Sequence, residues 1–191
     1  MIEAGLALLL VLSGASVAWF FPVRRYMIAL IRDVSLELEE ALNPVDKEYK
    51  LLGLYVGFHA KYRVRGLREV RALLVLTPRH ALLYLPIVYV RGEHDILVLE
   101  AEPHGGIIGE ECVIIRKATR PVRRVLARLG LANARLCGGR RGKMLTELLD
   151  SCSAGCLAAW ITRMGVGIAL RPAPGLAAYA ARRLASLARN L

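Results

Sequence analysis

The sequence predicts an α+β protein with an N-terminal transmembrane helix, on three observations. Residues 2–21 form an apolar run with one charge, Glu3. The middle of the chain alternates apolar and polar residues with the period of two that is typical of strands. The last third changes to helical spacing and is rich in arginine. The predicted parts are a transmembrane anchor at 1–21, a stalk helix at 22–43, a small antiparallel β domain at 44–118 and an Arg-rich helical region at 119–191.

The apolar run has the length of a membrane span. Its 20 residues, at 1.5 Å each, cover about 30 Å, the thickness of the hydrocarbon layer. Aromatic residues at 19–21 crowd its far end, where such rings prefer the membrane interface, and Arg24 and Arg25 follow. Positive charge after the span and none before it predicts an outside N-terminus and a cytoplasmic domain at the cell membrane. A signal peptide cleaved before Trp19 is the alternative, although the positive segment in front of such peptides is missing.

The stalk helix is predicted by apolar residues spaced four and three apart after Pro22. Two heptads are too few to argue for a coiled coil, so we expect this helix to pack on the domain that follows. Asn43 and Pro44 end it. The apolar residues are Met27, Ile31, Val34, Leu38 and Ala41.

The β domain is predicted from several runs of alternation. One long strand covers 52–64, and a turn leads to a second at 70–76, which makes a hairpin. Further strands are expected at 82–90, 95–102 and 112–118. Pro86 either makes the first of these runs an edge strand or breaks it. Short connections predict an antiparallel meander that forms a sandwich or a partly open barrel.

The C-terminal region is expected to be helical. A short basic helix lies between Thr119 and Gly130, a second helix is expected near 144–160, and a third follows Pro174. We interpret residues 153–170 as packed helix or as an interfacial segment. The third helix has an apolar side, so it lies on a membrane surface or docks on its own domain. That side consists of Leu176, Ala180, Leu184, Leu187 and Leu191.

Charge is distributed unevenly along the chain. Of the net charge of +11, residues 1–111 contribute −2 and residues 112–191 contribute +13. Such asymmetry predicts an anionic partner, either a lipid surface or nucleic acid, whereas a solvated charged face is the plainer alternative. Arginine, 22 of the 27 basic residues, suits bidentate contact with phosphate. The candidate residues for an anionic ligand are Arg116, Lys117, Arg120, Arg123, Arg124, Arg128, Arg140, Arg141, Lys143, Arg182, Arg183 and Arg189.

Motifs for catalysis or metal binding are weak. The glycine-rich loop 137–143 departs from a phosphate-binding P-loop at both ends, at Cys137 and Met144. The four cysteines form no CxxC pair, so Cys152 and Cys156 are only weak metal candidates. A disulfide is not expected in a cytoplasmic chain unless the source is a hyperthermophile. The four histidines are scattered, and we expect no catalytic residue, metal or cofactor.

These features predict a single-pass, membrane-anchored binding or scaffold protein, such as a subunit of a membrane-associated complex. Its basic C-terminal region would contact anionic lipid, and its polar sheet face would take a protein partner. The first alternative is a membrane-tethered protein that binds nucleic acid or the ribosome, although 6% aromatic residues are few for stacking on single strands. The second is an enzyme without a recognisable motif. The sequence does not predict an oligomeric state.

Overall fold

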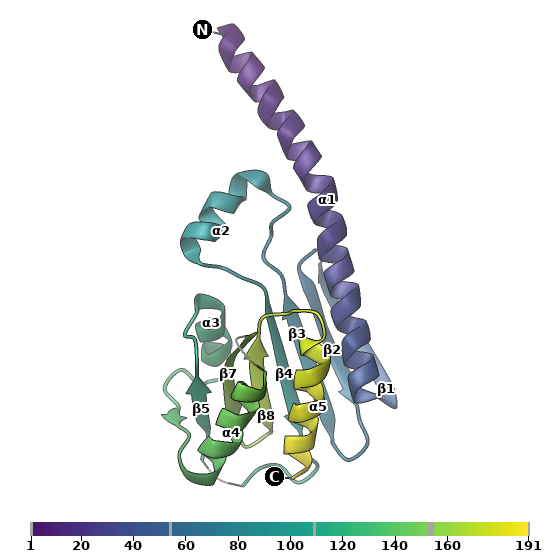
Figure 1. The fold of residues 1–191 in the computed structure, drawn as a ribbon, viewed down its shortest axis with the longest axis vertical. Helices are drawn as coiled ribbons and strands as arrows, with labels where there is room; N and C mark the ends of the chain where they lie inside the picture. The colour runs from purple at the N-terminus through teal and green to yellow at the C-terminus, as the bar shows by residue number, and fades with distance from the viewer. Residues whose placement is uncertain (1, 54, 109, 153–154, 191) are drawn as a thin grey trace.

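The computed structural model describes residues 2–53, 55–108, 110–152 and 155–190. It shows an α+β fold in which a long N-terminal helix leads into one open, mostly antiparallel sheet with further helices on both faces (Figure 1). The helices are α1 (Ile2–Leu42), the short 3-10 helix η1 (Leu82–Tyr84), α2 (Leu85–Arg91), α3 (Arg120–Arg128), α4 (Gly139–Ser151) and α5 (Leu176–Arg189). The strands are β1 (Asp46–Gly53), β2 (Gly57–Arg63), β3 (Glu69–Val75), β4 (Ile96–Glu102), β5 (Cys112–Ile115), β6 (Arg135–Leu136), β7 (Cys156–Ile161) and β8 (Val166–Leu170).

The sheet has eight strands in the order β1-β2-β3-β4-β8-β7-β5-β6. Strands β1 to β4 form the expected meander, but β8 and β7 lie between β4 and β5. The pair β5 and β6 is parallel and the other pairs are antiparallel. The sheet therefore includes strands from both sides of the domain boundary predicted at residue 118.

The two faces of the sheet carry separate cores because successive side chains along a strand point to opposite faces. Leu97 and Leu99 of β4 belong to the core under α1, α4 and α5. Ile96 and Val98 belong to a smaller core under α3. We call these the front face and the back face. Helix α3 covers only part of the back face, so the sides of β1, β2 and β3 that face the back remain more exposed.

Helix α1 has two halves with different surroundings. It is one continuous helix of 41 residues, although Pro22 deprives a carbonyl one turn earlier of its helical hydrogen bond. None of the described side chains in the apolar stretch of its first half is buried, whereas Met27, Val34 and Leu38 of its second half are at most 2% exposed. The predicted stalk helix and its packing on the domain are thus confirmed. The anchor and the stalk are one helix rather than two.

Polar contacts from α1 hold the neighbouring elements. The carboxylate of Glu37 accepts hydrogen bonds from the backbone N–H groups of Gly175 and Ala178, at 2.8 and 3.4 Å, at the start of α5. Glu39 accepts one from the hydroxyl of Tyr49 at 2.8 Å and pairs with Lys47 at 2.6 Å, both on the edge strand β1. The second half of α1 therefore fixes both α5 and the free edge of the sheet.

The strand register defines two ends of the sheet, which we call the near end, toward the apolar half of α1, and the far end, opposite to it. At the near end, the ring of Phe20 on α1 lies 6.3 Å from that of Tyr55, in the turn between β1 and β2. At the far end, α1 stops at Leu42 and β1 begins. Following the pairs from Lys47 through Tyr62, Val70, Ala101, Val166 and Ile161 leads to Cys112. The start of β5 therefore lies at the far end and its end lies at the near end.

Three predicted elements are wrong. The predicted strand at 52–64 is a hairpin, because the chain turns between Gly53 and Gly57, both at positive φ. The predicted strand at 82–90 is η1 and α2, which Pro86 starts in the first turn, where proline is tolerated. The segment at 153–170, expected as helix, holds strands β7 and β8, while residues 153 and 154 and the predicted stripe residue Leu191 lie outside the described residues. Small residues in β7 and β8 allow close packing from both faces and hide the strand alternation.

The buried side of α1 predicts a contrast between two leucines. Replacing Leu38, which is fully buried, with Ala should lower the free energy of unfolding of the full chain in detergent by about 2 to 5 kcal/mol, because it leaves a cavity in the core. Leu36→Ala, at a side chain that is 51% exposed, should change it by no more than about 0.5 kcal/mol. Chemical denaturation measures both, and equal losses would contradict the assigned buried face.

Candidate functional site

A cleft of about 370 Å³ lies on the back face of the sheet and is lined by charged side chains of both signs. Its floor is made by strands β3, β4, β7 and β8, and its wall by the end of α3 and the segment before β5. We call it the back-face cleft. The polar side chains that line it are Arg71, Glu100, Glu102, Glu111, Arg128 and Thr162, and Trp160 and Met164 add apolar surface.

The surroundings of Glu100 in the back-face cleft shift the pKa of its carboxyl. Burial raises the pKa of its carboxyl above the ordinary value for Glu. A hydrogen bond from the indole of Trp160 and the positive charge of Arg71 oppose that rise without cancelling it. Trp160 is fixed in turn because its indole lies over Gly167, where an added Cβ would come within 2.2 Å of the ring.

Glu102, two residues further along β4, is held in ion pairs with arginines. Its two carboxylate oxygens pair with Arg68 at 2.8 Å and with Arg71 at 3.1 Å, and Arg71 also pairs with Glu69 at 2.5 Å. Glu102 is 8% exposed, so these partners compensate a buried charge. The network fixes Arg71 beside Glu100, and the cleft thus offers a small polar molecule charge-assisted hydrogen bonds of both signs.

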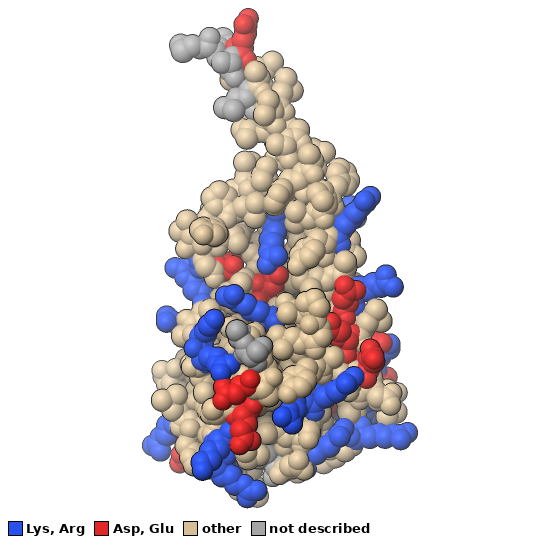
Figure 2. Space-filling model, viewed as in Figure 1, with Lys and Arg blue, Asp and Glu red and all other residues tan. Residues whose placement is uncertain are grey.

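The predicted anionic-ligand residues do not form one surface. Arg116, Lys117 and Arg120 lie at the near end, since Ile115 pairs with Ala158. Figure 2 shows basic side chains interleaved with acidic and uncharged residues on the face in view. The others divide between the two faces of the sheet: Arg123, Arg124 and Arg128 on α3 at the back, and Arg140, Arg141, Lys143, Arg182, Arg183 and Arg189 on α4 and α5 at the front.

Several of these arginines have contacts within the protein. Arg116 pairs with Asp150, and Arg124 pairs with Glu93 at 2.6 Å. The guanidinium of Arg183 lies 5.9 Å from the ring centre of Tyr179. Such contacts give these arginines a structural role as well as a charge.

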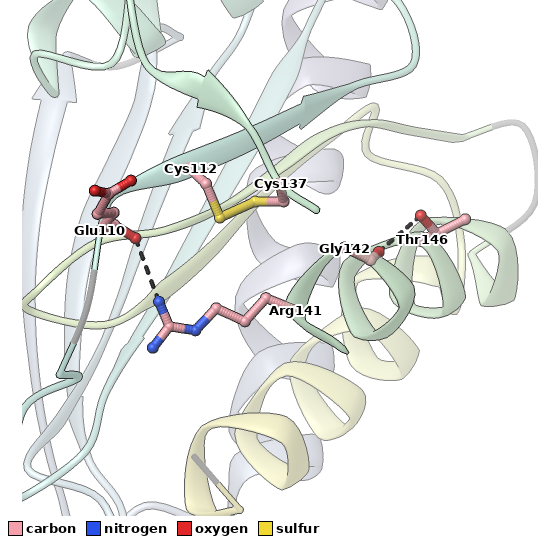
Figure 3. The surroundings of a disulfide bond; sticks show 6 residues. All are labelled: Glu110, Cys112, Cys137, Arg141, Gly142 and Thr146. Carbon is pink, nitrogen blue, oxygen red and sulfur yellow. Dashed lines mark hydrogen bonds between the residues drawn. A yellow bond between two sulfur atoms is a disulfide. The ribbon is translucent and has the colours of Figure 1, made fainter. Parts of the chain in front are cut away.

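The glycine-rich loop is the start of α4 at the far end of the sheet. A disulfide joins Cys112 to Cys137 (Figure 3), which corrects the expectation that the cysteines stay reduced. Gly142 packs so closely on this link that an added Cβ would lie 2.6 Å from the carbonyl oxygen of Cys137. Arg141 donates hydrogen bonds to the carbonyl oxygens of Ile108 and Glu110, the latter at 3.4 Å. The loop is therefore a packed joint between β5, β6 and α4.

Cys152 and Cys156 are buried free thiols. Their sulfurs share a hydrogen bond, and this bond together with burial raises the pKa of the Cys156 thiol, which keeps it protonated. No group of three or more His, Cys, Asp or Glu side chains suited to a metal ion occurs within the described part of the chain. The pair accordingly offers at most two of the ligands that a tetrahedral metal site needs.

Sequence reasoning missed the back-face cleft. Its residues come from β3, β4, α3, β7 and β8, which are far apart in the sequence. The one local signal was the pair Glu100 and Glu102, acidic residues at alternate positions of an otherwise apolar strand. Comparison with known proteins adds no assignment, because neither a family model nor a curated protein matches this chain.

Glu100 predicts a pH-dependent gain in stability. Because its pKa is raised by folding, its charged form destabilises the native state, and the penalty grows as the pH rises above the ordinary value of 4.5. Glu100→Gln should therefore unfold at higher denaturant concentration than the native protein at neutral pH, with the difference vanishing below pH 4.5. Glu48→Gln, at an exposed site of β1, is the matched control. A Glu100→Gln variant that is less stable at neutral pH would contradict the assigned cause.

The disulfide predicts sensitivity to reductant. It closes a loop of 25 residues, so its loss should lower the free energy of unfolding by about 3 to 4 kcal/mol in the chain-entropy treatment. The measurement is a denaturation curve with and without a reducing agent. The double variant Cys112→Ser, Cys137→Ser should have a lower free energy of unfolding than the native protein, and the reducing agent should not change its denaturation curve. Identical curves for the native protein in both conditions would show that the link is not formed.

Proposed function

We propose that this protein is a single-pass membrane-anchored binding protein that holds a rigid α+β domain at a membrane surface. The observation that carries the proposal is the division of α1. Its first half is bare, apolar and long enough to cross a membrane, and its second half is part of the domain core. A signal peptide cleaved before Trp19 would leave this second half in place, so the choice of a retained anchor rests on Arg24 and Arg25, which would have to cross the membrane if the run were a secretion signal.

In this proposal the N-terminus lies outside the cell membrane and the domain lies on the cytoplasmic side. Arg24 and Arg25 directly follow the apolar half of α1, and basic residues are retained on the inner side. The disulfide between Cys112 and Cys137 is then an intracellular one. Stable intracellular disulfides are characteristic of hyperthermophiles. We therefore propose a hyperthermophilic source for this protein.

Two surfaces support a role in binding. The back-face cleft supplies a site for a small polar ligand, and β1 is an edge strand with an exposed side, including Leu51 at 65% exposure. Free strand edges pair readily with a strand of another chain. We propose β1 as the contact for a protein partner within a membrane-associated complex.

We place the proposed contact with anionic lipid at the near end of the sheet. Arg116, Lys117 and Arg120 are there, at the same end of the sheet as the contact between Phe20 of α1 and Tyr55. Arg140 and Arg141, by contrast, follow the disulfide at the far end, beyond the reach of a bilayer that α1 crosses. Each basic residue close to an anionic leaflet contributes about 1 kcal/mol of attraction.

Nucleic-acid binding remains the alternative function. A continuous basic patch would support it, but the basic residues are divided between the two faces of the sheet. The second alternative, an enzyme, has one candidate group in Glu100, a carboxyl in the back-face cleft whose pKa is raised by burial, the direction in which enzymes tune Glu for general acid–base catalysis. The binding role accounts for more of the fold, because it also uses α1.

The test of the proposed topology is proteolysis of cells that carry the full chain with a C-terminal tag. In intact cells the tag should survive added protease, and it should be lost once the membrane is permeabilised, because the domain lies inside. The full chain should sediment with membranes. A tag digested in intact cells would overturn the orientation, and a freely dissolved full chain would overturn the anchor.

A further inference from the structure

The segment of η1 and α2 is apolar on almost every side and is exposed. Leu83, Tyr89 and Val90 are 74%, 89% and 85% exposed, and Val88 alone in α2 is buried. The sequence carries no charge between His80 and Arg91. Contiguous exposed apolar surface of this kind on a soluble protein marks a site of interaction with protein or membrane.

This segment lies at the height of α1 where the apolar run ends. The indole N–H of Trp19 donates a hydrogen bond of 2.8 Å to the carbonyl oxygen of Arg79, and the ring of Phe20 lies 6.1 Å from that of His80. Residues 16–21 of α1 and residues 80–83 line a common hollow. In Figure 1, α2 projects from this level to the side, above the sheet and away from α1.

The backbone of α2 is suited to a non-aqueous environment. Helical hydrogen bonds pair part of its backbone, Pro86 in its first turn has no N–H to leave unpaired, and the left-handed residue Gly92 ends it by donating to the carbonyl oxygens of Val88 and Tyr89. Unpaired backbone groups are costly in lipid, whereas a closed helix is tolerated. An apolar helix that is too short to span can still lie in the plane of the interface.

Basic and aromatic groups surround the segment where headgroups would lie. Arg24 and Arg25 follow the apolar run on α1, and Arg91 is in the last turn of α2. The nearby acids are paired: Asp95 with Arg79 at 2.8 Å and Glu93 with Arg124 at 2.6 Å. Aromatic rings and arginines at one level are typical of a membrane interface.

We propose that η1 and α2 insert into the interfacial layer of the same bilayer that α1 crosses, with phospholipid acyl chains as the ligand of Leu83 and Val90 and anionic headgroups as the ligand of Arg91. The inference rests on the proposed membrane anchor and adds a second attachment point. One helix leaves a domain free to tilt and rotate about its axis. A second contact to the side of α1 fixes the tilt and turns the far end of the sheet, with its disulfide, away from the membrane.

The test places a fluorescent label at one of two exposed apolar positions of the full chain in vesicles of phosphatidylcholine and phosphatidylglycerol. Val90→Cys reports on α2, and Leu136→Cys, 78% exposed at the far end, is the matched control. The native free thiols are buried and the others are paired. Quenching is measured with iodide in the water and with brominated acyl chains in the bilayer.

We expect brominated lipid to quench the Val90 label several-fold more than the Leu136 label, and iodide to show the reverse. Adding Leu83→Glu should shift the Val90 label toward iodide quenching, because a carboxylate disfavours insertion. Ile108→Glu, at a side chain 93% exposed near the far end, should leave it unchanged. Circular dichroism of each variant should match the native spectrum.

The remaining outcomes overturn the inference in distinguishable ways. If the chain does not float with the vesicles, the anchor itself fails and the proposed function fails with it. If the chain floats but iodide quenches both labels equally, the anchor stands and α2 is in water. If neither quencher reaches the Val90 label, α2 is covered by protein, such as a second copy of the chain, and the lipid contact is wrong.

Discussion

The burial of one side of α1 against the sheet and α5 is the contact on which the rest of the structure depends. Met27, Val34 and Leu38 belong to the same core as the strands and α5. These residues join the exposed apolar half of the same helix rigidly to the domain. Helix packing of this kind, with few voids, is stiff. The apolar half of α1 is therefore continuous with the fold, and the domain has a defined orientation relative to it.

That orientation gives the two ends of the sheet different roles. The near end carries the apolar segment of η1 and α2 and the basic residues that follow β5. The far end carries the disulfide and the packed glycine-rich loop. The back-face cleft opens nearer the far end, since Glu102 and Gly165 lie there. In the proposed topology, the cleft therefore opens on the side of the domain away from the membrane.

Local patterns in the sequence predicted the parts of this arrangement that local physics determines. The heptad spacing of α1 identified its buried side, and the proline and glycine around α3 identified its ends, because both depend on residues close in the chain. The segment 82–90 was misread because a continuous apolar run fits a buried strand and an exposed helix equally well. The back-face cleft, including Glu100 and Trp160, could not be predicted, since the order of strands that assembles it leaves no local signal.

The continuity of α1 through Pro22 is tested most directly by the distance between spin labels on its two halves, at Leu9 and Leu36, which are 66% and 51% exposed. In the full chain in lipid nanodiscs, an unbroken helix predicts one narrow distribution centred at about 40 Å, from 1.5 Å per residue. A broad distribution, or one centred at a clearly shorter distance, would mean that the helix breaks between membrane and domain. The anchor would then be a flexible tether, and the orientation described above would be lost.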